Sequence, residues 1–331
     1  MQSEAPSSSS PGPPALGSSA LHASTFREFE ALRSRLMGIA YRMLGSVADA
    51  EDVLQEAYLR WHETEHGSIQ NGEAWLVAVT TRLSIDRARR ATTERARYAG
   101  PWLPTPIATE EGSNPGWNVE RSDRLSVAFL LMLEQLSAVE RAVFVLREVF
   151  EYDYVLIASA IGKSEAATRQ LLHRARERVH AAEQRADKAV IGPLGSQREA
   201  MRGLLQRFLT ALEHGDRDSM LALLSPDVKL TSDGGGKVSA ARKTVVGADR
   251  VVRLFLGLRN KHVFAREYRL VELNGAPAWL SSLDGSTFAS TIVQCDGQHI
   301  TAFYRVLNPD KLASLRRSVC GGGTRRPPLP K

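Results

Sequence analysis

The sequence has 331 residues, enough for two or three domains, and its 43% hydrophobic and 24% charged residues are typical of a globular protein. No apolar stretch approaches the roughly 20 residues that cross a bilayer, and the N-terminus lacks the basic start and apolar core of a signal peptide. The two cysteines, Cys295 and Cys320, belong to no CxxC or Cys/His cluster, which indicates a reducing cytoplasm and argues against a structural zinc site. We therefore expect a cytoplasmic protein without a membrane partner, a metal or a cofactor.

Residues 1–24 consist mainly of Ser, Pro, Gly and Ala, which predicts a disordered leader. In residues 25–98, apolar side chains recur at helical spacing and predict three helices, with Asp49 as a plausible N-cap of the middle one. Residues 25–73 carry five Arg and nine acidic residues, whereas residues 74–98 carry six Arg and two acidic residues. This asymmetry suggests two faces with different partners, the basic one suited to phosphate, although a solvated helix surface would have the same composition.

A break rich in Pro and Gly spans residues 99–126, and residues 127–186 again have a helical pattern. Gly162 can adopt the left-handed conformation that ends a helix, and Ser164 can cap the next one, which predicts a helix-turn-helix. When the helix that follows Ser164 is projected along its axis, its side chains divide into an apolar side and a polar side. The polar side can reach base edges in a major groove. The polar side contains Glu165, Arg169, Gln170, His173 and Arg176. An ordinary surface helix with basic residues is the alternative.

From residue 197 the pattern changes to an α+β domain that we expect to end at residue 313, before a basic tail at 314–331. Two amphipathic helices, Glu199–His214 and Asp216–Leu224, come first. The dipeptides Asn274-Gly275 and Asp296-Gly297 are strong hairpin signals, so we expect an antiparallel sheet. The predicted strands are Val228–Thr231, Thr244–Val246, Arg269–Leu273, Thr287–Cys295 and His299–Val306.

Two parts of the helical half resemble RNA polymerase sigma factors. Asp49–Trp61 resembles the DAED-type helix of the sigma-2 domain, and Ala74–Arg90 resembles the helix that reads the −10 promoter element. Leu136–Arg178 resembles the sigma-4 domain, which reads the −35 element. The resemblance implies two all-α domains, a sigma-2 segment (25–98) and a sigma-4 segment (127–186), joined by a linker (99–126). The housekeeping sigma domains are missing, which points to the extracytoplasmic-function (ECF) class, a non-enzymatic DNA-binding class that binds core polymerase for transcription initiation.

The same resemblance implies site residues. Polymerase contacts would be made to the clamp helices of the largest subunit and to the flap, the former through Asp49, Glu51, Asp52, Gln55 and Glu56. The −10 element would be read by Arg82, Asp86, Arg89 and Arg90, with a flipped base held by the loop at about residues 65–72. Arg82 stands where many relatives outside the subgroup described below have Asn, so their base preference does not transfer. The −35 element would be read by the polar side of the Ser164 helix.

Three further motifs resemble signatures of one subgroup, in which a SnoaL-like domain of the polyketide-cyclase cone fold is fused to the sigma factor. The linker motif Trp102–Pro106 resembles WLPEP, with Thr105 in place of the usual acid. The other two motifs are Asp233–Lys237 and Asn308–Leu312. The resemblance implies regulation in cis by this domain. We expect regulatory contacts from Trp102, Pro104, Asp233, Gly234, Gly235, Gly236, Lys237, Asn308, Pro309, Asp310 and Lys311.

Other functions of the C-terminal domain remain open at this point. Asp233, Asp284 and His299 are candidate catalytic residues, although Asp233 is expected to face solvent in its Gly-rich loop. A small ligand in a non-catalytic cavity is a second possibility, and a protein-interaction module is a third. For the whole chain, the alternative is a helix-turn-helix regulator that carries a ligand-binding or enzymatic SnoaL-like domain and needs no polymerase.

Overall fold

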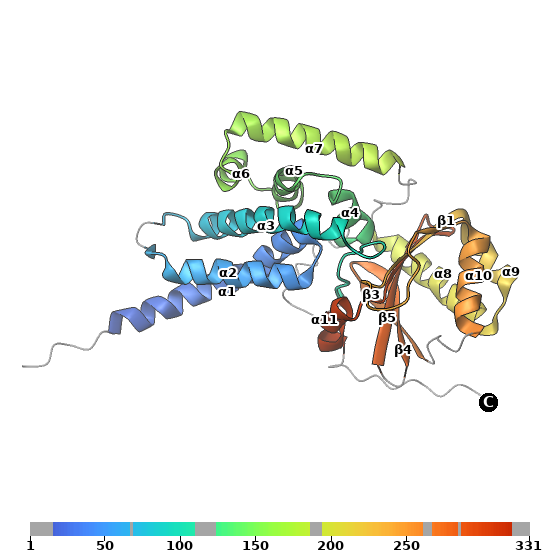
Figure 1. The fold of residues 1–331 in the computed structure, drawn as a ribbon. Coiled ribbons are helices and arrows are strands. Elements are labelled where there is room, and N and C mark those ends of the chain that lie inside the picture. Colours follow the sequence, from blue (N-terminus) through green and yellow to red (C-terminus); the bar gives the residue numbers. More distant parts are fainter. Residues whose placement is uncertain are drawn as a thin grey trace, which may run out of the picture.

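The computed structural model describes residues 16–66, 69–109, 124–185, 194–260, 267–283 and 286–319 (Figure 1). Three helices form the sigma-2 segment: α1 (Leu16–Leu44), α2 (Val47–Glu63) and α3 (Gly72–Ala96). The sigma-4 segment contains α4 (Val127–Leu133), α5 (Ala138–Phe144), the π-helical turn η3 (Val145–Val149), α6 (Tyr154–Ile161) and α7 (Glu165–Arg185). Helix α1 includes residues 16–24, where a disordered leader was expected; residues 1–15 lie outside the described residues.

Local sequence explains where these helices begin and end. Ser46, and not Asp49, is the N-cap of α2, because its extended backbone lets its Oγ accept a hydrogen bond from the Asp49 amide over 3.3 Å. Gly162 ends α6 with a φ of 66°, and the Ser164 Oγ accepts a hydrogen bond from the Ala167 amide over 3.2 Å. The predicted helix-turn-helix punctuation is therefore confirmed.

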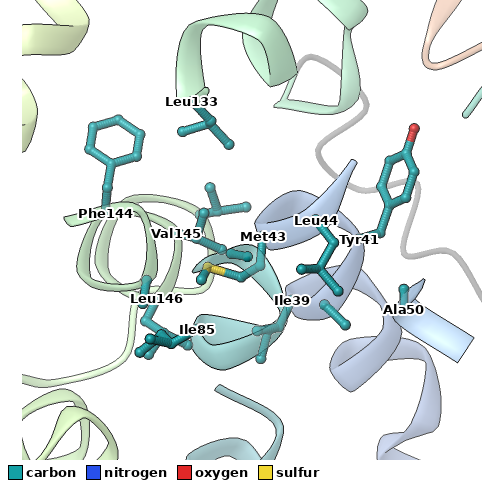
Figure 2. Packing of buried hydrophobic residues seen from close by; sticks show 14 of the residues in the cluster. Ile39, Tyr41, Met43, Leu44, Ala50, Ile85, Leu133, Phe144, Val145 and Leu146 are labelled. Atoms are coloured by element: carbon teal, nitrogen blue, oxygen red, sulfur yellow. The ribbon is translucent and has the colours of Figure 1, made fainter. Parts of the chain in front are cut away.

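The sigma-2 and sigma-4 segments share one hydrophobic core. Figure 2 shows Ile39 and Met43 of α1 and Ile85 of α3 beside Phe144 and Leu146 of the sigma-4 segment, and all five are buried. Each such side chain contributes about 1.5–3 kcal/mol when it leaves water. The two segments therefore form one packed body in this structure, with α6 resting on α3.

The C-terminal part is a six-stranded sheet with helices on both faces. It begins with α8 (Leu194–His214) and α9 (Arg217–Ala222), and α10 (Ala248–Asn260) lies between β2 and β3. The sheet order is β2-β1-β6-β5-β4-β3, in which β1 and β6 are parallel and the other neighbours are antiparallel. The strands are β1 (Leu224–Asp233), β2 (Val245–Val246), β3 (Glu267–Leu273), β4 (Ala276–Leu283), β5 (Ser286–Cys295) and β6 (Ile300–Val306); α11 (Pro309–Val319) follows.

The two faces of the sheet have different neighbours. One face packs against α8, α9 and α10 around an aromatic cluster in which Phe208 and Phe303 have ring centroids 5.0 Å apart. On the other face, strand residues pack against Leu103 of the linker, Val127 of α4 and Leu312 of α11. The linker is therefore held against the sheet by a hydrophobic cluster that also includes part of the sigma-4 segment.

The structure corrects the predicted C-terminal domain in three respects. The sheet is mixed, because β1 and β6 are parallel neighbours. They are far apart in the sequence, so no local signal sets their relative direction. Strand β4 was missed, because Pro277 lacks a donor and Ala and Ser are weak strand formers. Helices α10 and α11 were also missed. Residues 309–313 begin a helix, with the Asn308 Oδ1 accepting from the Asp310 amide over 3.1 Å and Pro309 at the first helical position.

Candidate functional site

The residues expected to bind polymerase lie on α2, mostly exposed. Glu51, Asp52 and Gln55 are exposed, and Glu56 pairs with Arg60 over 2.9 Å. Asp49 differs, because its carboxylate lies 2.7 Å from the Arg87 guanidinium and ties α2 to α3. The opposite stripe of α2 is buried in the shared core. An acidic face formed by Glu51, Asp52, Gln55 and Glu56 therefore remains open to a partner.

The residues expected to read the −10 element divide into two groups. Asp86, Arg89 and Arg90 are exposed on α3. Arg82 is also exposed, but it donates hydrogen bonds to the main-chain carbonyls of Ser159 (2.7 Å) and Ala160 (2.8 Å) at the end of α6. The Ser159 carbonyl also accepts from the Gly162 amide over 3.4 Å. Carbonyls at the C-terminus of a helix carry the negative end of the helix dipole, so a guanidinium suits them. The sigma-4 segment thus engages one end of the expected −10 surface.

The expected base-flipping loop is only partly described, since residues 67–68 lie outside the described residues. Trp75, next to that loop, is half-buried and lies 5.3 Å from the buried Trp61 ring, centroid to centroid. Trp75 therefore packs against the core, as its residue type suggested.

The residues expected to read the −35 element lie on α7. Leu172, Ala175 and Val179 are buried, which confirms the apolar side of the projection. Arg169, Gln170, His173 and Arg176 are exposed and Glu165 is half-buried. Three guanidiniums of α7 are paired within the sigma-4 segment: Arg169 with Glu165 over 2.8 Å, and Arg176 with Glu148 and Arg178 with Glu140, each over 2.6 Å.

The three subgroup motifs meet around one carboxylate, that of Asp233. Its oxygens accept hydrogen bonds from the Tyr98 hydroxyl (2.7 Å), the Leu103 amide (2.9 Å) and the Gly235 amide (3.0 Å), and lie 2.7 Å from the Lys311 ammonium. Asp233 is fully buried, so the expectation that it faces solvent is wrong. The β1 strand continues to Asp233 and the linker then covers it, which a Gly-rich sequence does not reveal.

Lys311 and Arg95 both place a cation against the ring of the linker tryptophan. The Lys311 ammonium lies 4.4 Å from the Trp102 ring centroid, and the Arg95 guanidinium lies 3.6 Å from it. Lys311 also donates to the Leu103 carbonyl over 2.5 Å. Burial lowers the pKa of Lys311 to about 8, against the opposing attraction of Asp233. A cation from the C-terminal domain and one from α3 therefore contact the same linker residue.

The glycines of the Asp233–Lys237 motif allow a close approach that no other residue would. A Cβ on Gly235 would lie 2.3 Å from the Asn308 amide nitrogen, and the φ of Gly235 is 62°. A Cβ on Gly236 would lie 3.0 Å from the Ala99 Cβ of the linker. Lys237 also pairs with Asp310 over 2.5 Å. Both motifs of the C-terminal domain thus pack on each other and on the linker.

The remaining site residues have these positions. Pro104 is buried in the linker, and Pro309 begins α11 beside Asn308, whose Nδ2 donates to the Tyr98 hydroxyl over 2.9 Å. Thr105, which replaces the usual acid, is buried and its amide donates to the Gly45 carbonyl over 2.8 Å. Asp284 and Cys320 lie outside the described residues, and Cys295 is buried and free.

Within the described residues, no group of three or more His, Cys, Asp or Glu side chains could hold a metal ion. In the same part of the chain, no helix is both long and apolar enough to span a membrane. His299 is half-exposed beside a hairpin turn, where its amide donates to Asp296 over 2.8 Å.

Two contact residues were missed from the sequence. Tyr98 and Arg95 lie in the last turns of the basic segment, where their role depends on segments distant in the chain. Burial and the Asp233 carboxylate both raise the pKa of Tyr98 above its usual value, so its hydroxyl remains a donor at neutral pH. No local signal distinguishes these two residues from an ordinary helix end.

Comparisons with known proteins agree with this arrangement. Residues 29–94 match Sigma-70 region 2, and residues 126–179 match Sigma-70, region 4. The ECF RNA polymerase sigma factor SigJ of Mycobacterium tuberculosis is 38% identical over 295 residues, which are 86% of this chain and 92% of that protein. A probable ECF RNA polymerase sigma factor SigI from the same species is 32% identical over 297 residues, 89% of this chain and 97% of that protein.

A solved structure is also similar. The crystal structure of the Mycobacterium tuberculosis ECF sigma factor SigJ covers 87% of this chain, and 98% of its own chain is matched, with a TM-score of 0.67 and 33% identity. The predicted multidomain architecture is confirmed, with sigma-2 and sigma-4 domains followed by an α+β part. The chain acts in promoter-directed transcription initiation, interacts with RNA polymerase and DNA, and is not an enzyme. It belongs to the family of ECF RNA polymerase sigma factors.

Proposed function

We propose that this sigma factor is inhibited in cis by its C-terminal domain, which holds the linker and the two sigma segments in a closed arrangement. By closed arrangement we mean the state in which α6 rests on α3 and the linker lies against the sheet. The Asp233 carboxylate is the observation that carries the proposal, because it joins Tyr98, the Leu103 amide and Lys311 in one buried site. A buried carboxylate with such partners fixes the positions of all of them.

The closed arrangement would inhibit because it occupies part of the promoter surface. Arg82 is exposed, but its Nε and one Nη bond to the α6 carbonyls and would have to leave them to contact a base or a phosphate. Release of the linker would let the sigma-4 segment leave α3. The acidic face of α2 would bind the clamp helices of the polymerase, and the sigma-4 segment would bind the flap. Since core polymerase works in the bacterial cytoplasm, we place the protein there.

In the open state, in which the sigma-4 segment has left α3, two groups of exposed side chains would contact the two promoter elements. Asp86, Arg89, Arg90 and the released Arg82 would face the −10 element. Arg169, Gln170, His173 and Arg176 would face the −35 element, with Glu165 at the edge of that surface. Arginine, glutamine and histidine donors are suited to base edges in the major groove.

Transcription in vitro with core polymerase tests the proposal. Tyr98→Phe removes a hydroxyl that bonds to both Asp233 and Asn308 while leaving the C-terminal sheet untouched. We expect this variant to transcribe several-fold more than the full-length protein. Tyr304→Phe is the matched control, because its hydroxyl donates within the sheet, to Gln294 over 2.9 Å. Equal transcription from full-length protein, Tyr98→Phe and a chain ending before Gly192 would overturn inhibition in cis.

A further inference from the structure

The turn between β3 and β4 is buried, although hairpin turns usually lie at the surface. Asn274, at this turn, has no exposed surface and a φ of 52°, in the left-handed region that Asn tolerates. The turn between β5 and β6 differs, since Asp296 and Gly297 there are exposed. One hairpin turn of the sheet is therefore enclosed by other parts of the chain, and its neighbour is not.

The side-chain amide of Asn274 bonds to α1 and to two distant parts of the linker. Its Oδ1 accepts from the Ile107 amide of the linker over 3.1 Å. Its Nδ2 donates to the Tyr41 hydroxyl of α1 over 2.8 Å and to the Leu125 carbonyl, just before α4, over 3.0 Å. The Tyr41 hydroxyl in turn donates to the Thr105 carbonyl over 2.6 Å. An Asn side chain has one carbonyl oxygen and two N–H donors, and here all of them are used.

The main chain around this turn also binds the linker. The main-chain amide of Asn274 donates to the Ile107 carbonyl over 2.9 Å, and Ala108 forms an antiparallel bridge with Leu273. The Thr109 hydroxyl accepts from the Gly275 amide over 2.9 Å and donates to the Glu272 carboxylate over 3.0 Å. Because β3 is an edge strand, the linker can pair with its open edge, and it does so through this one bridge.

We propose that the Asn274 turn is a second docking point of the C-terminal domain, distinct from the Asp233 site, and that it positions α1, the linker and the start of α4 together. The Asp233 site holds the beginning of the linker, at Tyr98 to Leu103, whereas the Asn274 turn holds residues 105–109. Its role in holding the closed arrangement rests on the proposed function.

Burial makes this turn sensitive to the arrangement of both sigma segments. If α1 and α4 separate, the Nδ2 group loses at least one acceptor, and a buried donor without an acceptor is strongly disfavoured. The side-chain amide of Asn274 makes all of these hydrogen bonds only when Tyr41, Ile107 and Leu125 keep their positions. Movement of the sigma-4 segment is thus coupled to release of the linker through a single side chain.

Two substitutions separate the turn conformation from the side-chain contacts. Asn274→Gly keeps a residue that tolerates positive φ and removes the amide. Asn274→Asp keeps the acceptor for the Ile107 amide but places an oxygen against the Leu125 carbonyl. Asp296→Gly, in the exposed neighbouring turn, is the matched control. Tyr41→Phe removes the α1 partner without altering the C-terminal domain.

Hydrogen exchange on the full-length chain tests the docking directly. We expect Asn274→Gly, Asn274→Asp and Tyr41→Phe to raise amide exchange at Ile107 and Thr109 by roughly tenfold or more, with β5 and β6 still protected. Asp296→Gly should leave these two amides unchanged. If the Asn274 variants also unfold the sheet, amide exchange in Tyr41→Phe alone tests whether the linker docks at this turn. Unchanged protection of Ile107 and Thr109 in Tyr41→Phe and in any folded Asn274 variant would overturn the proposal.

Transcription by the same variants separates this docking point from regulation in cis. Faster exchange at the linker with unchanged transcription would leave the docking point standing and would count against regulation in cis. Unchanged exchange together with higher transcription by Tyr98→Phe would reject the Asn274 docking point alone.

Discussion

Arg82 of α3 donates a hydrogen bond to the Ala160 carbonyl at the end of α6 over 2.8 Å. It also donates to the Ser159 carbonyl, so one guanidinium closes the last turn of the first helix of the helix-turn-helix. A residue expected to contact promoter DNA therefore has a protein partner in the closed arrangement. The closed arrangement and promoter binding would compete for the same side chain.

The first prediction concerns that contact. Arg82→Gln should lower the free energy of unfolding by about 1 kcal/mol, because the α6 carbonyls lose a charged donor. Arg89→Gln, on the same helix, is the control, since Arg89 pairs only weakly with the exposed Asp86 over 3.3 Å. Urea denaturation of both variants measures the difference. Equal destabilisation by the two would show that the α6 contact contributes nothing measurable.

The second prediction concerns the acidic face of α2. Reversing Asp52 and Glu56 to Lys should weaken binding to core polymerase by about tenfold or more at moderate salt, because charge complementarity is replaced by repulsion. The fold should be retained, since neither side chain is buried. Asp218→Lys is the control, because Asp218 is 92% exposed on α9 of the C-terminal domain. Unchanged core affinity of the double variant in a titration would contradict the assignment.

The third prediction concerns the −35 surface of α7. Arg169→Ala or Arg176→Ala should cost about 1–3 kcal/mol at one promoter position if the residue is bidentate to guanine. Arg178 is paired with Glu140 and lies away from that face, so Arg178→Ala should weaken all promoters about equally. Binding to a promoter series with single substitutions measures both effects. A uniform loss for Arg169→Ala would instead make Arg169 a phosphate contact.

The fourth prediction concerns the ion network between the sigma-2 and sigma-4 segments. Glu134 bonds to Arg141 over 2.7 Å and also to Arg95, and the Arg141 side chain is 6% exposed. Glu134→Gln leaves two guanidiniums without their counter-charge, so the free energy of unfolding should fall by about 3–5 kcal/mol. Glu177→Gln, whose side chain is 67% exposed, should change it by less than about 0.5 kcal/mol. A small effect at Glu134 in chemical denaturation would mean that water already screens this network.

Sequence patterns could predict the helical half because its helices follow local rules. The periodicity of α7 and the Gly162 stop signal needed no knowledge of the rest of the chain. The prediction that Asp233 faces solvent failed, because its burial depends on the linker. Leu103 of the linker lies 130 residues from Asp233 in the chain. Likewise, Asn274-Gly275 predicted a hairpin, but nothing local indicates that α1 and the linker enclose it.

The last prediction concerns pH and the Lys311–Asp233 contact. Burial holds the pKa of Lys311 at about 8 in the folded protein, whereas an unfolded lysine keeps the ordinary value of 10.5. Below pH 8 both states are protonated, and the folded state bears the full penalty of a buried cation. Between about pH 8 and 10.5 the unfolded chain binds more protons than the folded chain, so stability from this group rises with pH.

The two pKa values differ by about 2.5 units, so at about 1.4 kcal/mol per unit the rise is at most about 3.5 kcal/mol. The variant Lys311→Gln should lack this rise, whereas Lys237→Gln should keep it, since the Lys237 side chain is 55% exposed beside Asp310. Urea denaturation at pH 7, 8, 9 and 10 gives the free energy of unfolding of each variant and of the unsubstituted protein. The titrations of the other groups cancel in the difference between the two. The free energy of unfolding of Lys311→Gln could instead differ from that of the unsubstituted protein by the same amount at every pH. That result would show that Lys311 remains charged in its site, because Asp233 compensates for its burial.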